Sequence, residues 1–374
     1  MKKETFFVTG GAGFIGTNLV RMLAAEHPEA RIVVLDALTY CGNISSISDL
    51  IEAGRIEFVR GDIADRELVS TLFDRYRPAY IINFAAETHV DRSLDDSRPF
   101  VRTNVEGTLN LLDCALAVRR AELAAGSEPS LRKFVQIGTD EVYGQLDIDI
   151  PEGRPLPEAA AAALGRQGVT YGTVSFSETS PLQPSSPYSA AKTSADLLAL
   201  SFFHSFGLPV VVTRCSNNYG PYQHPEKLIP LMINNILARK PLPVYGRGLN
   251  VRDWIHVDDH CRGVLTAAVD GKPGRVYNFG GYSERRNIDI VHSLIRIVAG
   301  MLDDNAGIDD SLVTYVGDRP GHDMRYAIDA ARSMAELGWK PEVDYDHGLE
   351  STDVTYTHIR AHETNAKSVW RLLR

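Results

Sequence analysis

Short apolar runs alternate with stretches of helical periodicity through the first two thirds of the chain. The runs at residues 5–9, 31–35, 56–60, 80–84, 133–137 and 208–214 predict buried strands, because they are brief, rich in Val, Ile and Phe, and bounded by Gly, Asn, Asp or Pro. Helix-like stretches follow at residues 18–23, 67–76, 99–120 and 188–206. Repeated strand–helix units of this kind predict an α/β fold with a doubly wound parallel sheet.

Two parts of the chain depart from this alternation. Residues 145–176 carry prolines, glycines and an alanine run, which predict an inserted surface segment to which we assign no chemistry. Beyond residue 217 the regular alternation of predicted strands and helices ends. We therefore expect a nucleotide-binding domain made of residues 1–217, 251–280 and 345–362. Residues 218–250 and 281–344 are expected to form a smaller, discontinuous substrate-binding domain.

Charge and cysteine content exclude several classes of protein. The net charge of -9 gives no general attraction to nucleic acid or to an anionic membrane. Met1–Lys3 lead straight into the first strand, so we expect no signal peptide. The four cysteines and eleven histidines show no metal-ligand or redox spacing, which favours a reduced cytoplasmic location and no metal.

The first strand is followed by Gly10, Gly13 and Gly16, and then by a helix. Glycines there allow a dinucleotide to approach the backbone, and the helix N-terminus faces its pyrophosphate, as in a Rossmann fold. Asp36 ends the second strand, 20 residues after Gly16, where a carboxylate binds the adenosine ribose and repels a 2′-phosphate. The pattern therefore predicts NAD rather than NADP. Asp62, after the third strand, is placed to reach the adenine amino group.

Asp140 and Glu141 follow the strand at residues 133–137 directly. A lone pair of this kind is more often a solvated turn. At the carboxyl end of a parallel strand, however, ligands bind, so two adjacent carboxylates suggest an acid and a base acting on one small substrate.

Tyr188 and Lys192 lie four residues apart at the start of a predicted helix and so share one face. A nearby ammonium and a cationic nicotinamide would lower the pKa of the phenol, which could then accept the proton of an alcohol while hydride leaves its carbon. Taken alone, the pair is more often a packed tyrosine and a surface lysine of an amphipathic helix, but after a dinucleotide loop we favour the catalytic interpretation.

With these motifs in place, the chain resembles the extended short-chain dehydrogenase/reductases that act on nucleotide sugars. Within them it is similar to the dTDP-glucose 4,6-dehydratases over residues 5–350. The most specific matching stretches are residues 36–43 (DALTYCGN), 85–93 (AAETHVDRS), 139–144 (TDEVYG), 217–231 (NNYGPYQHPEKLIPL), 245–258 (YGRGLNVRDWIHVD) and 318–329 (DRPGHDMRYAID).

The resemblance implies a role for each matching residue. Cofactor-binding residues are expected to be Gly10, Gly13, Phe14, Ile15, Gly16, Asp36, Ala37, Leu38, Thr39, Asp62, Ile63, Ala85, Ala86, Glu87, Thr103, Tyr188, Lys192 and Asn218. Substrate-binding residues are expected to be Thr88, His89, Thr139, Asn217, Lys227, Leu228, Pro243, Val244, Tyr245, Arg252, Asn287, Asp318, Arg319, His322 and Tyr326. Arg252 and Arg319 also have the forked donors that suit a diphosphate, and Tyr245 could stack on a pyrimidine.

The implied reaction converts dTDP-glucose to dTDP-4-keto-6-deoxyglucose and water, in deoxysugar synthesis such as the dTDP-rhamnose pathway. Tyr188, Lys192 and Thr139 would serve oxidation at carbon 4, whereas Asp140 and Glu141 would serve the elimination. An epimerase, decarboxylase or other dehydratase of the same family acting on a UDP-sugar is the alternative, and Asp140-Glu141 argues against an epimerase. A non-catalytic NAD-binding regulator would be expected to lack these residues. The resemblance also implies a homodimer joined through the helices near 99–120 and 188–206.

Overall fold

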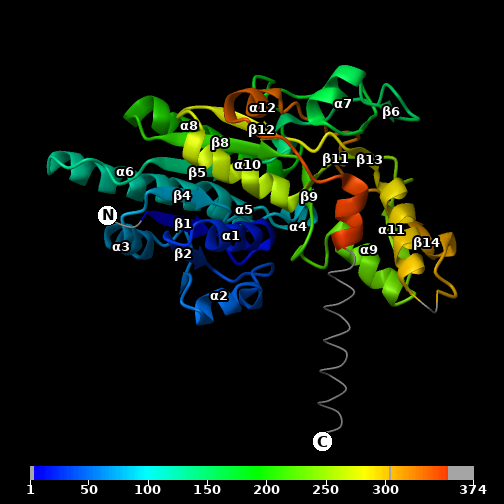
Figure 1. Ribbon diagram of the computed structural model, residues 1–374, viewed down its shortest axis with the longest axis horizontal. Helices are drawn as coiled ribbons and strands as arrows, with labels where there is room; N and C mark the ends of the chain where they lie inside the picture. The colour runs from blue at the N-terminus through cyan, green and yellow to red at the C-terminus, as the bar shows by residue number, and fades with distance from the viewer. Residues whose placement is uncertain (1–3, 303–304, 353–374) are drawn as a thin grey trace, which may run out of the picture.

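The computed structural model describes residues 4–302 and 305–352 (Figure 1). At its centre lies a seven-stranded sheet in the order β12-β8-β5-β4-β1-β2-β3, with every neighbouring pair parallel. Its strands are β1 (Thr5–Thr9), β2 (Arg31–Asp36), β3 (Glu57–Arg60), β4 (Tyr80–Asn83), β5 (Lys133–Ile137), β8 (Val210–Cys215) and β12 (Val276–Phe279). The direction of winding reverses between β1 and β4, which opens a crevice at their carboxyl ends. The predicted Rossmann-type doubly wound sheet is confirmed.

Helices cover both faces of this sheet. Because successive side chains of a strand point to opposite faces, Phe6 and Val8 of β1 pack in one core while Phe7 packs in the other. The first core is covered by α1 (Phe14–Glu26) and α10 (Val257–Asp270), and the second by α3 (Arg66–Tyr76), α6 (Thr108–Ala124) and α8 (Pro187–Phe206). Burial on both faces explains why these strands read as continuous apolar runs.

The helix expected at residues 99–120 is not a single regular helix. It begins as α5 (Arg98–Phe100), widens into a π-helical segment at Val101–Gly107, and continues as α6 to Ala124. In the wide segment the Asn104 side chain accepts a hydrogen bond from the Glu87 N–H (2.9 Å) and donates one to the Glu87 carbonyl (3.1 Å). The π-turn therefore ties the helix to the loop after β4, a tertiary constraint that helical periodicity does not reveal.

A smaller unit occupies one end of the molecule, where Figure 1 shows α9, α11 and β14 gathered. It contains a three-stranded sheet of β9 (Asn217–Tyr219), β11 (Val251–His256) and β13 (Glu284–Arg286), a pair of β10 (Leu242–Tyr245) and β14 (Val313–Val316), and the helices α9 (Leu228–Leu237) and α11 (Asn287–Met301). The side chains of Tyr219, Ile233, Trp254 and Leu294 meet in its core.

The packing divides the chain differently from the expected domains, in which residues 251–280 and 345–362 belonged to the first domain and residues 281–344 to the second. β11 pairs with β9 and β13 rather than with the large sheet, and its Trp254 and Ile255 point into two different cores. α12 (Ala331–Leu337) and Trp339 pack on the nucleotide-binding unit, whereas Tyr345 and Leu349 return to the smaller core. When the side chains of one strand alternate between two cores, as in β11, the sequence gives no signal of where one domain ends and the next begins. Residues 353–362 of the expected first domain lie outside the described residues.

The inserted segment at residues 145–176 is more firmly packed than expected. It forms β6 (Arg154–Pro155), α7 (Glu158–Leu164) and β7 (Val169–Thr170). Thr170 is buried and donates a hydrogen bond to Glu284 (2.8 Å), which also forms a buried ion pair with Arg325 (2.7 Å). The segment thus supports residues 318–329, one of the stretches that carry the resemblance. The remaining short elements are α2 (Ser48–Glu52), α4 (Val90–Asp95) and the 3₁₀ turns Ile44–Ser46, Asp140–Tyr143 and Asp310–Leu312.

Candidate active site

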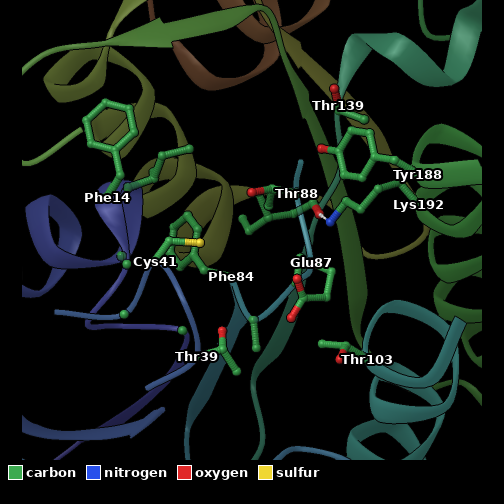
Figure 2. Close-up of a pocket in the computed structure, with 18 of the residues that line it drawn as sticks. Phe14, Thr39, Cys41, Phe84, Glu87, Thr88, Thr103, Thr139, Tyr188 and Lys192 are labelled. Atoms are coloured by element: carbon green, nitrogen blue, oxygen red, sulfur yellow. Dashed lines mark hydrogen bonds between the residues drawn. The ribbon is translucent and has the colours of Figure 1, made fainter. Parts of the chain in front are cut away.

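One cavity of about 920 Å³ runs along the carboxyl ends of the central strands. Many of the residues expected to bind cofactor or substrate line it. They lie in the loops that follow β1, β4 and β5, at the end of β2, and on α1, α8 and β9. Figure 2 shows Tyr188, Lys192 and Thr139 on one side of this cavity and Phe14 and Cys41 across from them. The lining includes Gly10, Gly13, Phe14, Ile15, Gly16, Asp36, Ala37, Thr39, Asp62, Ile63, Ala85, Ala86, Glu87, Thr88, Thr103, Thr139, Asp140, Glu141, Tyr188, Lys192, Asn217, Asn218 and Lys227.

The glycine-rich loop forms a cradle that side chains would fill. Gly10 has φ +66°, and a Cβ added there would lie 2.6 Å from the Ala85 nitrogen. A Cβ at Gly16 would collide with the Gly10 carbonyl oxygen. Helix α1 begins at Phe14 with Gly13 as its N-cap, so no side chain satisfies the first N–H groups, which stay available to an anion. This geometry fits the pyrophosphate of a dinucleotide.

Asp36 ends β2 at the rim of the cradle. Its carboxylate accepts hydrogen bonds from the N–H groups of Ala12 (2.9 Å) and Leu38 (2.8 Å), so it also ties two loops together. Burial raises the pKa of Asp36, and the two backbone hydrogen bonds oppose that rise. Asp62 lines the same end of the cavity and forms an ion pair with Arg102 (2.8 Å).

Asp36→Ala is expected to weaken NAD binding and to reduce the preference for NAD over NADP, because the carboxylate that repels a 2′-phosphate is gone. Loosening of the two loops would lower both affinities, so the ratio of the two dissociation constants is the measurement. A ratio equal to that of the wild type would show that Asp36 does not select the cofactor.

The two carboxylates lie on the 3₁₀ turn Asp140–Tyr143, which follows β5. Thr139 starts this turn, and its hydroxyl accepts the N–H of Glu141 (3.3 Å). Burial raises the pKa of Asp140 well above its ordinary value, and Glu141 and Asp253 add to the rise. Burial also raises the pKa of Glu141, but Arg252, Arg319 and Lys227 oppose it. The rise in pKa is larger for Asp140, whereas the three cations limit it for Glu141, so Asp140 suits the role of acid and Glu141 that of base.

Burial of Asp140 predicts a cost in stability. Because its pKa is raised on folding, the stability contributed by this group is complete below the unfolded pKa and is lost as pH rises through the folded pKa. Asp140→Asn removes the ionisation and is expected to stabilise the protein at neutral pH by roughly 0.5–2 kcal/mol.

Denaturant unfolding at acidic and neutral pH measures this difference, with Asp147→Asn, an exposed position nearby, as the matched control. Equal stability of Asp140→Asn and wild type at neutral pH would contradict the predicted burial cost.

A buried polar network lies behind the turn. The Tyr143 hydroxyl donates to Asn278 (2.8 Å) and accepts from Arg214 (3.0 Å), and Arg214 donates to Asp196 (2.9 Å). Asp196 lies one helical turn after Lys192 on α8 and opposes the fall in the Lys192 pKa that burial causes. Sequence reasoning missed this network, although an arginine inside the apolar run of β8 was a signal for it.

Tyr188 is buried at the start of α8, and its environment differs from the expectation. Burial raises the pKa of Tyr188 well above its ordinary value, and the Glu141 charge raises it further, while a hydrogen bond with Thr139 opposes the rise. The Lys192 ammonium donates to the Ile137 carbonyl (2.5 Å). In the protein without cofactor, the Tyr188 pKa is thus raised, not lowered as expected. The positive charge of a bound oxidised nicotinamide would act in the opposite direction and lower it.

A second set of predicted residues lies beyond the lining of this cavity, largely on the smaller unit. These are Leu38, His89, Leu228, Pro243, Val244, Tyr245, Arg252, Asn287, Asp318, Arg319, His322 and Tyr326. Arg252 is buried, donates to the Asp323 carbonyl (2.9 Å) and lies over the Tyr326 ring (4.2 Å). Val244 differs from the expectation, because its side chain packs in the core of the smaller unit.

Several residues that line the cavity were not predicted from the sequence. Cys41, Arg102, Cys215 and Glu226 are among them. Cys41 belongs to one of the matching stretches, and Glu226 precedes Lys227, so their positions in the sequence were signals. Nothing in the sequence indicated a role for Arg102, because its approach to Asp62 depends on the π-helical segment.

A glycine cradle, a buried acid–base pair and a tyrosine–lysine pair in one cleft define a nicotinamide-dependent enzyme that handles an alcohol and its neighbouring carbon. Comparison with known proteins agrees with this class. Residues 6–280 match the model of the NAD-dependent epimerase/dehydratase family, and the chain belongs to that family.

Within this family, the similar proteins are dTDP-glucose 4,6-dehydratases. The chain is 44% identical over 345 residues to a probable dTDP-glucose 4,6-dehydratase of Sinorhizobium fredii, covering 92% of this chain and 90% of that one. It is 41% identical to the dTDP-glucose 4,6-dehydratase of Salmonella typhimurium, covering 96% and 95%. The crystal structure of the dTDP-glucose 4,6-dehydratase DesIV of Streptomyces venezuelae, with NAD and TYD bound, superposes with a TM-score of 0.80 at 40% identity, covering 96% and 98%.

Proposed function

We propose that this protein is a hydro-lyase that converts dTDP-glucose to dTDP-4-keto-6-deoxyglucose and water with NAD as cofactor. One observation carries the proposal: Asp140 and Glu141 lie side by side at the carboxyl end of β5, in the cavity that also holds Tyr188 and Lys192. A dehydrogenase or epimerase needs the tyrosine and lysine, whereas loss of water also needs an acid and a base.

NAD fits the cradle of Gly10, Gly13 and Gly16, with Asp36 at the ribose end. When bound, it supplies a hydride acceptor for sugar carbon 4 and, once reduced, a hydride donor for carbon 6. Because the cofactor would be regenerated in each cycle, we expect it to stay bound to the purified protein.

The residues of the chain divide the proton transfers among them. Tyr188, as a phenolate stabilised by Lys192, accepts the proton of the carbon-4 hydroxyl, while Thr139 binds the same sugar oxygen. The ketone at carbon 4 makes the carbon-5 hydrogen acidic. Glu141 removes that proton, and Asp140 donates a proton to the departing carbon-6 hydroxyl, which leaves as water. Glu141 then returns a proton to carbon 5 as carbon 6 is reduced. Exchange with solvent removes the proton that Tyr188 gained and replaces the one that Asp140 lost.

The substrate diphosphate is assigned to Arg252, Arg319, Asn217 and Asn287, and the sugar to Thr88, Thr139 and Lys227. Lys227 is partly buried, and its ammonium donates to the Thr88 carbonyl (3.4 Å), which joins the two units across the cleft. Tyr245, which is 42% exposed at the end of β10, is the platform proposed for the thymine ring.

A homodimer is proposed through α6 and α8. Val101 and Leu109 on the α6 side and Leu197 on α8 are exposed apolar residues, with 47%, 37% and 52% of their surfaces accessible. Pairing these helices with a second copy would bury them in a four-helix interface. We also propose a cytoplasmic enzyme of deoxysugar synthesis, with the dTDP-rhamnose pathway as one setting. No helix in residues 4–302 and 305–352 is long and apolar enough to cross a membrane.

Separate incubations with dTDP-glucose and UDP-glucose test the proposal. Formation of a 4-keto-6-deoxy sugar from dTDP-glucose, faster than from UDP-glucose, is the expected result. A product that differs from the substrate only in configuration at carbon 4 would instead identify an epimerase. Faster turnover of UDP-glucose would refute the thymidine assignment.

A further inference from the structure

An ion pair joins the two units of the protein. Asp91 lies in the first turn of α4, just after the β4 loop of the nucleotide-binding unit. Its Oδ1 accepts a hydrogen bond from the Nη1 of Arg319 (3.0 Å), which belongs to the segment after β14. The two side chains are only partly exposed, 37% for Asp91 and 25% for Arg319.

Asp91 also contacts a second residue of the proposed nucleotide site. Its Oδ2 accepts a long hydrogen bond from the Tyr245 hydroxyl (3.5 Å). Arg319 and Tyr245 are the groups assigned above to the diphosphate and to the thymine base. One carboxylate of the protein thus contacts both of them, but the 3.5 Å contact with Tyr245 is weak, so Arg319 is the group that Asp91 holds.

Arg319 is left with unused binding capacity. Asp91 contacts one of its terminal nitrogens, whereas its Nε–H is buried and finds no acceptor among the described residues. A guanidinium binds a phosphate best through two parallel hydrogen bonds. A diphosphate carries more charge than a carboxylate and can use both donors, so it would compete successfully for Arg319.

We propose that Asp91 is an internal counter-anion that holds Arg319 in the substrate-free site and is displaced by the substrate diphosphate. The inference rests on the proposed function, because it takes Arg319 as a diphosphate ligand. It assigns to Asp91 a role opposite to that of a substrate-binding residue. Asp91 competes with the nucleotide and sets its affinity, and the same competition favours release of the product, which carries the same diphosphate.

The test is calorimetric titration of the NAD-loaded protein with thymidine diphosphate and, separately, with thymidine. Because partly exposed ion pairs are weak, Asp91→Asn is expected to bind thymidine diphosphate about two- to fivefold more tightly than the wild type. Thymidine has no diphosphate and should bind both proteins equally. Asp95→Asn removes the same charge from an exposed position on the same helix, and it should leave both affinities unchanged.

Arg319→Gln provides the second arm of a double-mutant cycle. In that background Asp91→Asn should no longer tighten thymidine diphosphate, because the competing pair does not exist. Unchanged or weaker binding of thymidine diphosphate by Asp91→Asn would overturn the inference, and weaker binding would make Asp91 a positioning residue for Arg319. A wild-type protein that binds thymidine diphosphate no better than thymidine would refute the proposed function as well.

Discussion

Tyr188→Phe is expected to fold normally and to lose about 10²–10⁴-fold in the rate of the first hydride transfer, the range typical of a general base. The phenylalanine fills the same buried space but cannot accept the proton of the carbon-4 hydroxyl. The measurement is the absorbance of the reduced nicotinamide in a single turnover with dTDP-glucose. Tyr76→Phe is the matched control, because it also removes the hydroxyl of a largely buried tyrosine. The Tyr76 hydroxyl donates to Glu57, and neither residue lines the cavity.

The pH dependence of this step carries a further consequence. Since burial and the Glu141 charge raise the Tyr188 pKa, hydride transfer should quicken as pH rises until the phenol ionises in the loaded enzyme. Cofactor reduction by Tyr188→Phe at a rate close to that of the wild type would show that Tyr188 is not the base.

Asp140→Asn and Glu141→Gln are expected to slow overall turnover by about 10²–10⁴-fold each, while still allowing oxidation at carbon 4. Both substitutions keep the shape of the turn. They remove, respectively, the acid that protonates the leaving hydroxyl and the base that removes the carbon-5 proton. In a single turnover, reduced nicotinamide should therefore form and persist, in contrast to Tyr188→Phe.

Solvent deuterium separates the two carboxylates. Glu141→Gln should suppress exchange at carbon 5, because no base remains there, whereas Asp140→Asn should exchange carbon 5 without losing water. Carboxylate variants that block cofactor reduction as fully as Tyr188→Phe, or that turn over like the wild type, would refute this division of roles.

The larger unit of the fold was predictable because its signals are local. A strand buried on both faces is an apolar run, and a glycine cradle between a strand and a helix is a short motif. The smaller unit had no such signal. β11 pairs with β9 and β13, and β10 pairs with β14, across separations of about 30 to 70 residues. These pairings depend on tertiary packing, so the sequence indicated only that the alternation ends.

The candidate site was predictable where residues sit at the ends of strands, as Asp36, Asp140 and Glu141 do. Contacts between distant segments were not. Arg319 meets Asp91 and Arg214 meets Asp196 only because the fold brings their elements together. The direction of the Tyr188 pKa shift was likewise hidden, because it depends on burial and on the Glu141 charge rather than on the spacing to Lys192.

The central claim is that oxidation, loss of water and reduction occur at one site on one bound sugar. The fate of the hydrogen on carbon 4 tests it most directly. dTDP-glucose carrying deuterium at carbon 4 is converted in ordinary water, and the product is examined by NMR spectroscopy. The account predicts that the deuterium appears at carbon 6 of the same molecule. Retention of the label at carbon 4, or its loss to the solvent, would contradict it.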